Sequence, residues 1–84
     1  MSAIESRIIA IMSRTAMVPQ SQFTPERKLS ELGIGSLEQI ECVLSLEDEL
    51  QIELNDRDFQ GLQTVQAVVD AVTRAYNERQ RART

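Results

Sequence analysis

Apolar residues recur every three or four positions in three separate stretches of this chain, a spacing typical of amphipathic helices. The first stretch follows a capping box formed by Ser2 and Glu5, and we expect its helix to run to about Ala16. Its apolar stripe consists of Ile4, Ile8, Ile11 and Met12. A helix with one apolar stripe needs a packing partner, and 84 residues give room for one domain. The pattern therefore predicts a small helical protein with one shared core.

Two further helices are predicted downstream. A second capping box, Ser36 with Gln39, begins a helix that we expect to span Ser36 to about Leu50. Its apolar positions are Leu37, Ile40, Val43, Leu44, Leu46 and Leu50. Thr64 caps the last helix. The apolar stripe of that helix consists of Val65, Val68, Val69, Val72 and Tyr76.

The connections differ in length and character. Residues 17–35 show no sustained periodicity, and a connection of this length tends to be functional. Gly33 and Gly35 give it a permissive backbone just before the second helix. Residues 52–54 alternate like a strand but have no pairing partner, so we interpret them as a connector. Asn55 with Asp58 predicts a short helical turn that contains Phe59 and ends near Gly61. We expect Phe59, like Met17, to be a packing residue.

The expected fold is all-α. It is a small four-helix bundle of three main helices and one short helix, with a long first loop. We expect residues 1–84 to form a single domain, with a core at about 2–76 and an Arg-rich tail at 77–84. We expect a monomer.

The composition excludes most mechanisms in which side chains catalyse a reaction. The chain contains no histidine, so the commonest general base and the Ser-His and Cys-His nucleophile pairs are excluded. Its single cysteine, Cys42, has no neighbouring base to lower its pKa and is expected to be a small, partly buried helix residue. We expect no catalytic residue and no metal site.

The charge is concentrated in the middle of the chain. Residues 31–58 contain nine acidic residues and one basic residue, whereas the whole chain has a net charge of −4. This segment would repel phosphate backbones and attract a basic patch on a protein partner, so we expect no nucleic-acid binding. No apolar run long enough for a signal peptide or a membrane span is found, and we expect a soluble, cytoplasmic protein without membrane contact.

Ser36 begins this acidic helix. In the simplest interpretation it is the helix N-cap. The same position favours a phosphate, because backbone N–H groups and the helix dipole are positive there. Glu38, Glu41 and Asp48 fall close to one line on the helix surface and form an acidic stripe that begins at the serine.

The residues Leu32-Gly33-Ile34-Gly35-Ser36-Leu37 resemble the Leu-Gly-x-Asp-Ser-Leu motif of the acyl carrier proteins. The resemblance extends from the first helix to Val72 and includes the acidic end of the second helix and Thr64-Val65-Gln66. Asp56 and Asp58 match the short third helix of that family. The resemblance implies a 4′-phosphopantetheine arm on Ser36 that holds an acyl or aminoacyl group as a thioester. The protein would then carry its cargo while partner enzymes catalyse.

The resemblance also implies partners. These are a phosphopantetheinyl transferase and the acyl- or aminoacyl-loading and acyl-processing enzymes, with basic docking patches, of pathways such as fatty acid or polyketide biosynthesis. The implied partner-binding residues are Glu38, Glu41, Leu37, Leu44, Glu47 and Asp48. A solvated helix face is the alternative interpretation of the charged ones. The positions implied to line a chain-sheltering core are Leu46, Leu54, Leu62 and Val68, for which ordinary core packing is the alternative.

The chain departs from the family pattern at Gly35, where the family has the aspartate that helps engage the transferase. Gln51 and Asn55 replace a usual glycine and a usual proline. Together the three changes suggest a specialised carrier. The alternative function is an unmodified carrier-like module that acts only through protein interaction. An independent enzyme is disfavoured by the missing histidine.

Overall fold

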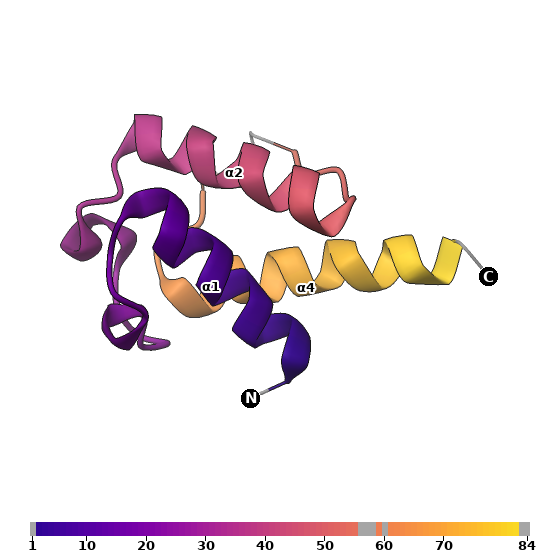
Figure 1. Ribbon diagram of the computed structural model, residues 1–84, viewed down its shortest axis with the longest axis horizontal. Helices are drawn as coiled ribbons and strands as arrows, with labels where there is room; N and C mark the ends of the chain where they lie inside the picture. The colour runs from indigo at the N-terminus through magenta and orange to yellow at the C-terminus, as the bar shows by residue number, and fades with distance from the viewer. Residues whose placement is uncertain (1, 56–58, 60, 83–84) are drawn as a thin grey trace.

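The computed structural model describes residues 2–55, 59 and 61–82. Its elements, in chain order, are α1 (Ala3–Ala16), the 3₁₀ turns η1 (Gln20–Gln22) and η2 (Leu29–Leu32), α2 (Ser36–Leu50) and α4 (Val65–Ala82) (Figure 1). The regular elements in these ranges are all helical, which confirms the all-α prediction. The short helix expected near Asn55 rests on Asp56 and Asp58, which lie outside the described residues.

The ends of α1 follow the local signals in the sequence. The Glu5 N–H donates to Ser2 Oγ (3.3 Å) and the Ser2 N–H donates to Glu5 Oε1 (3.0 Å), so the predicted capping box is present. The helix ends at Met17, whose backbone is left-handed (φ 60°) and whose N–H donates to the Ser13 carbonyl. Met17 was expected to pack, and that prediction is wrong. Its side chain is 89% exposed because the left-handed cap lies outside the helix face that meets the core.

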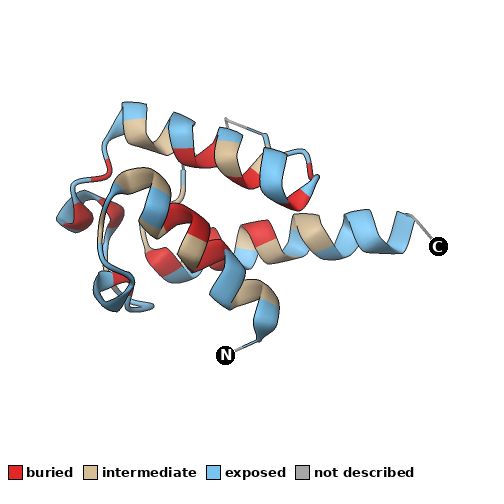
Figure 2. Ribbon diagram, viewed as in Figure 1, coloured by how far each residue is buried: buried red, intermediate tan, exposed pale blue. Residues whose placement is uncertain are grey.

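The core lies where α1 packs against α2 and α4 (Figure 2). The largest fully buried side chains are Ile8, Met12, Leu29, Ile34, Leu46, Val65, Val68, Val72 and Cys42. The predicted stripes of the first and last helices therefore face the core, with Ile4 and Tyr76 packed at its edge. Phe59 is buried as expected.

The long connection between α1 and α2 is fixed against the beginning of α4. The Leu29 N–H donates to the Gln63 carbonyl (2.8 Å), and an isolated β-bridge pairs Lys28 with Thr64. In the opposite direction, the Val65 N–H donates to the Arg27 carbonyl (2.9 Å). The Gln66 N–H likewise donates to the Pro25 carbonyl (3.0 Å), so the first two N–H groups of α4 have partners that the helix itself cannot supply. These bonds also set the position from which the chain enters α2.

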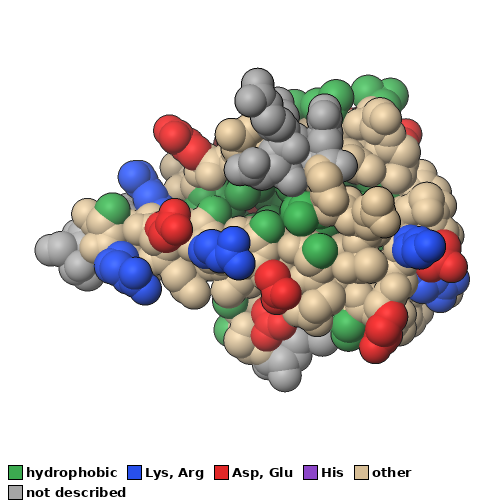
Figure 3. Space-filling view, turned by 180° about the vertical axis from the view of Figure 1, so that it is seen from behind, with side chains coloured by type: hydrophobic (Ala, Val, Ile, Leu, Met, Phe, Trp, Pro, Cys, Tyr) green, Lys and Arg blue, Asp and Glu red, His purple; other side chains and the backbone are tan. Residues whose placement is uncertain are grey.

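The end of α4 extends beyond the core. Thr64 caps this helix as predicted, because the Ala67 N–H donates to Thr64 Oγ1 (3.2 Å). Residues 77–82, expected as a tail, continue the helix to Ala82 with exposed side chains. Figures 1 and 3 show this end projecting past the rest of the molecule, with basic and acidic side chains on it. Among the described residues, no helix is long and apolar enough to cross a membrane.

Candidate functional site

The chain turns sharply just before Ser36. Gly33 ends η2 with a left-handed backbone (φ 75°), a conformation that favours glycine. Ile34 is then buried, and its N–H donates to the Leu29 carbonyl (3.0 Å). This anchored residue positions Gly35 and the first turn of α2, and Ser36 is exposed as the first residue of the helix.

The capping arrangement lies one residue earlier than the sequence suggested. Gly35, and not Ser36, is the N-cap, because the Gly35 carbonyl accepts the first helical bond from the Gln39 N–H (2.9 Å). The Gly35 N–H in turn donates to Glu38 Oε1 (2.9 Å). The predicted capping box of Ser36 with Gln39 is therefore wrong, although the predicted helix bounds are confirmed. Ser36 is placed at the helix start without being needed to cap it.

Gly35 does not use the backbone freedom of glycine. Its φ of −88° and ψ of −167° are extended values that any residue adopts, so the expected permissive backbone applies to Gly33 only. The space beside Gly35 is nevertheless restricted. A Cβ on this residue would lie 3.1 Å from Glu38 Oε1.

The outward face of α2 combines apolar and acidic side chains. At 3.6 residues per turn, Leu37, Glu41, Leu44 and Asp48 lie within about 60° around the helix axis. All four are exposed, Leu37 by 65% and Leu44 by 60%. Ile40, beside this face, is 47% exposed. The sequence analysis placed Ile40 only in the apolar stripe of the helix. Its position, about one turn from Leu37 and from Leu44, could have indicated that it belongs to the same exposed face. Large exposed apolar side chains that lie together indicate an interaction surface.

Two of the predicted partner-binding residues lie on the flanks of this face. Glu38 accepts the Gly35 N–H, and Glu47 Oε2 accepts the N–H of Leu54 (2.9 Å). Both carboxylates are half-buried and hold backbone next to α2. On the α1 side, Glu49 pairs with Arg14. The acidic stripe predicted from Glu38, Glu41 and Asp48 is thus divided, and Glu41 and Asp48 face outward while Glu38 is turned back to the helix start.

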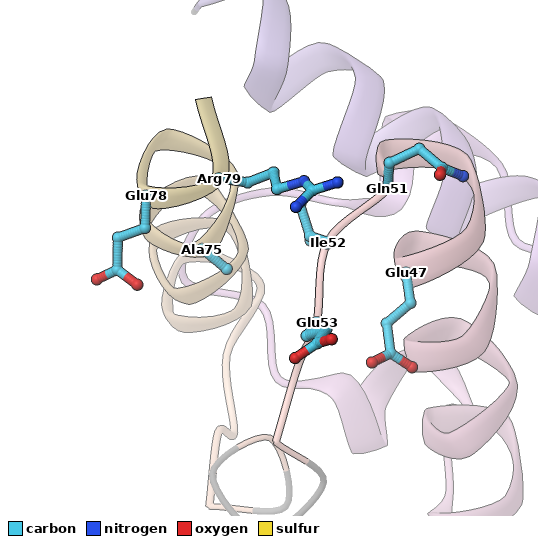
Figure 4. Close-up of a pocket in the computed structure, with 7 residues that line it drawn as sticks. All are labelled: Glu47, Gln51, Ile52, Glu53, Ala75, Glu78 and Arg79. Atoms are coloured by element: carbon cyan, nitrogen blue, oxygen red, sulfur yellow. The ribbon is translucent and has the colours of Figure 1, made fainter. Parts of the chain in front are cut away.

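A groove of about 540 Å³ lies at the other end of α2 (Figure 4). Its lining residues are Glu47, Gln51, Ile52, Glu53, Ala75, Glu78 and Arg79. In Figure 4 the Arg79 side chain extends from α4 toward the connector at Ile52. Fifteen residues of helix, about 22 Å, separate Gln51 from Ser36, so this groove is distinct from the serine site. In the part of the chain that the structure describes, no group of three or more His, Cys, Asp or Glu side chains could hold a metal ion.

Two other hollows lie nearer the serine or the core. One, of about 350 Å³, lies beside the first turn of α2, with Ser30, Ile34, Gln39 and Gln63 among its lining residues. Another, of about 400 Å³, has an apolar wall, to which Leu54, Phe59, Leu62, Ala71 and Ala75 contribute. Of the four residues implied to shelter a chain, Leu46 and Val68 are fully buried, whereas Leu54 and Leu62 are half-buried and line this second hollow.

Cys42 lies on the buried side of α2. Burial, with smaller contributions from Glu41 and Glu38, raises the pKa of the Cys42 thiol to about 11. The thiol is therefore protonated at neutral pH and is a packing group, as expected from the sequence.

The sequence comparison agrees with this geometry. Residues 6–72 match the PP-binding family, described as the phosphopantetheine attachment site. The match covers more than half of the chain and includes both Ser36 and the helices that place it. The chain therefore belongs to this family of carrier domains, whose members attach 4′-phosphopantetheine covalently to a serine.

Proposed function

We propose that the protein carries an acyl or aminoacyl group as a thioester on a 4′-phosphopantetheine arm attached to Ser36. The observation that carries this proposal is an exposed serine at the first residue of α2, inside the segment that matches the family. The bound arm would supply a thiol, which the chain itself lacks in reactive form because Cys42 is buried.

The surroundings of Ser36 fit this group. A phosphodiester on Ser36 Oγ would lie at the positive end of the α2 dipole, beside first-turn N–H groups that have no intrahelical acceptor. Ser36 is not committed to capping the helix, so modification of its hydroxyl leaves the cap at Gly35 intact. Gln39 and Gln63 line the adjacent hollow, and side-chain amides of this kind can hydrogen-bond the amide groups of an arm.

The outward face of α2 fits the proposed partners. A phosphopantetheinyl transferase and the enzymes that load or process the cargo would place apolar side chains on Leu37 and Leu44. Basic side chains around them would meet Glu41 and Asp48, with Glu38 and Glu47 at the flanks. Charges at the edge of such a contact mainly set the association rate and the choice of partner.

Whole-protein mass spectrometry tests the proposal. The protein is co-expressed with a transferase of broad specificity, and we expect one added arm in the wild type and none in Ser36→Ala. Gly35, where the acyl carrier proteins have aspartate, favours a second candidate, an unmodified interaction module. An unchanged wild-type mass with several transferases would contradict carriage and support that module.

A further inference from the structure

The hollow of about 350 Å³ beside the first turn of α2 lies within reach of a group attached to Ser36. One of its lining residues is Gln39, three positions after the serine. Residues with this spacing are neighbours on one helix face, with roughly 5–6 Å between their Cβ atoms. The chain just before α4 lines the same hollow through Leu62 and Gln63. A flexible arm on Ser36 therefore meets this hollow before any other part of the core.

Backbone hydrogen bonds hold the walls of this hollow in place. The Leu29 N–H donates to the Gln63 carbonyl (2.8 Å), and the Ile34 N–H donates to the Leu29 carbonyl (3.0 Å). Lys28, another lining residue, is bridged to Thr64. The loop before α2 and the chain before α4 thus form one fixed unit around the hollow. A group that enters a site with fixed walls pays little for ordering the protein.

The lining combines apolar side chains with polar groups that have no partner. Leu29 and Ile34 are buried, and Leu62 is half-buried. Within residues 2–55, 59 and 61–82, the side-chain amides of Gln39 and Gln63 make no hydrogen bond. An amide group gains from a partner of its own kind, because each side supplies both a donor and an acceptor. The hollow therefore fits a ligand that has both apolar groups and amides.

We propose that this hollow is a resting site for the 4′-phosphopantetheine arm, in which the side chains of Gln39 and Gln63 hydrogen-bond the amide groups of the arm. This inference rests on the proposed function. The arm has the matching chemistry, because it carries a phosphodiester, a pair of methyl groups and two amides between the serine and its thiol. Lys28 adds a positive charge to the lining, which suits the phosphodiester. Leu37 and Leu44 do not line the hollow, so an arm at rest leaves the outward face of α2 open to a partner.

NMR spectroscopy of the loaded protein tests the contact directly. The protein carries ¹³C-labelled methyl groups, the arm is unlabelled, and intact mass confirms complete loading. We expect nuclear Overhauser effects between the pair of methyl groups of the arm and the methyl groups of Leu29, Ile34 and Leu62. Loaded protein in which the arm shows no such contacts would overturn the resting site.

Urea denaturation measures how far the two glutamines hold the arm. A group that binds only the folded state stabilises it, so loading should raise the free energy of unfolding. Part of this gain comes from the phosphate at the α2 dipole and is shared by all variants. We expect Gln39→Ala and Gln63→Ala each to reduce the ratio of bound to free arm about fivefold, as the loss of one hydrogen bond predicts, and so to reduce the gain on loading. Both variants keep the backbone bonds that shape the hollow, because only the carbonyl of Gln63 takes part in them.

Gln80→Ala is the matched control. Gln80 is exposed on the projecting end of α4 and does not line the hollow, so this variant should keep the wild-type gain on loading. A gain that Gln80→Ala lowers as much as Gln39→Ala, or that neither Gln39→Ala nor Gln63→Ala lowers, would overturn the role of the two amides.

The outcomes separate this inference from the proposed function. A wild-type protein that no transferase loads would overturn the proposed function, and the resting site with it. A protein that is loaded on Ser36 but holds its arm away from the hollow would overturn the resting site and leave the proposed function intact.

Discussion

The two faces of α2 have similar apolar side chains, but one face is buried in the core and the other is exposed to solvent. Leu46 and Leu50 are buried in the core, whereas Leu37 and Leu44 on the same helix are more than half exposed. Glu41 and Asp48 accompany the exposed leucines, and Cys42 and Val43 accompany the buried ones. One helix thus has leucines that stabilise the core and leucines that stay exposed, the latter on the face that we propose for partner binding. Variants on one face only therefore test whether the two faces have separate roles.

The largest expected difference lies between two leucines on these faces. Leu46→Ala removes a fully buried side chain and should lower the free energy of unfolding by about 3 kcal/mol. Leu44→Ala removes an exposed one and should change it by less than about 0.5 kcal/mol while weakening partner binding. Urea denaturation measures both values. Equal destabilisation by the two variants would show that the faces are not divided.

The buried face should also be sensitive to alkaline pH. The folded state raises the pKa of Cys42 from 9.0 to about 11, so ionisation occurs first in the unfolded chain. Stability is therefore complete below pH 9 and falls as pH rises toward 11, by on the order of 2 kcal/mol. Denaturation at several pH values measures this slope, with Cys42→Ala as the control. If the slope is the same in that variant, the thiol is not its source.

The end of α2 should gain stability from a glycine. Gln51 is left-handed (φ 55°), a conformation that costs most residues roughly 1 kcal/mol and costs glycine little. Gln51→Gly should therefore raise the free energy of unfolding by up to about 1 kcal/mol, and the Tm with it. Met17→Gly, at the other left-handed cap, gives an independent comparison. A lower Tm in both variants would contradict the strain assigned to these caps.

The smallest effect on stability is expected from the charge of the outward face. Glu41→Lys should slow association with a partner enzyme several-fold, while the free energy of unfolding changes by less than about 0.5 kcal/mol. Added salt should weaken association of the wild type because it screens these charges. Glu26→Lys reverses an exposed charge outside α2 and serves as the matched control. An association rate that neither salt nor Glu41→Lys alters would exclude this role.

Local signals predicted much of this fold. The bounds of α1 and α2 follow from capping residues and from spacing, which act within a few positions along the chain. The N-cap of α2 was misplaced because Gly35 with Glu38 and Ser36 with Gln39 have the same spacing. The structure distinguishes the two pairs, because the Gln39 N–H donates to the Gly35 carbonyl and this bond makes Gly35 the N-cap.

Features that depend on tertiary packing could not be predicted from the sequence. The sequence places Ser36 at a helix start, but it does not show that Ile34 and Leu29 anchor the turn before it. Met17 was misassigned because exposure depends on where the chain leaves α1, and that is set by the packing of the whole molecule. The hydrogen bond from the Gly35 N–H to Glu38 likewise needs coordinates, because the spacing alone does not show which of the two pairs caps the helix.

We propose that Ser36, and no other serine, carries the arm. Trypsin releases residues 29–57 as one peptide that contains three serines, Ser30, Ser36 and Ser45. After loading by a transferase, fragmentation of this peptide locates the added mass on one residue. We expect the added mass on Ser36 in every loaded molecule. An added mass on Ser30 or Ser45, or one that remains in Ser36→Ala, would contradict it.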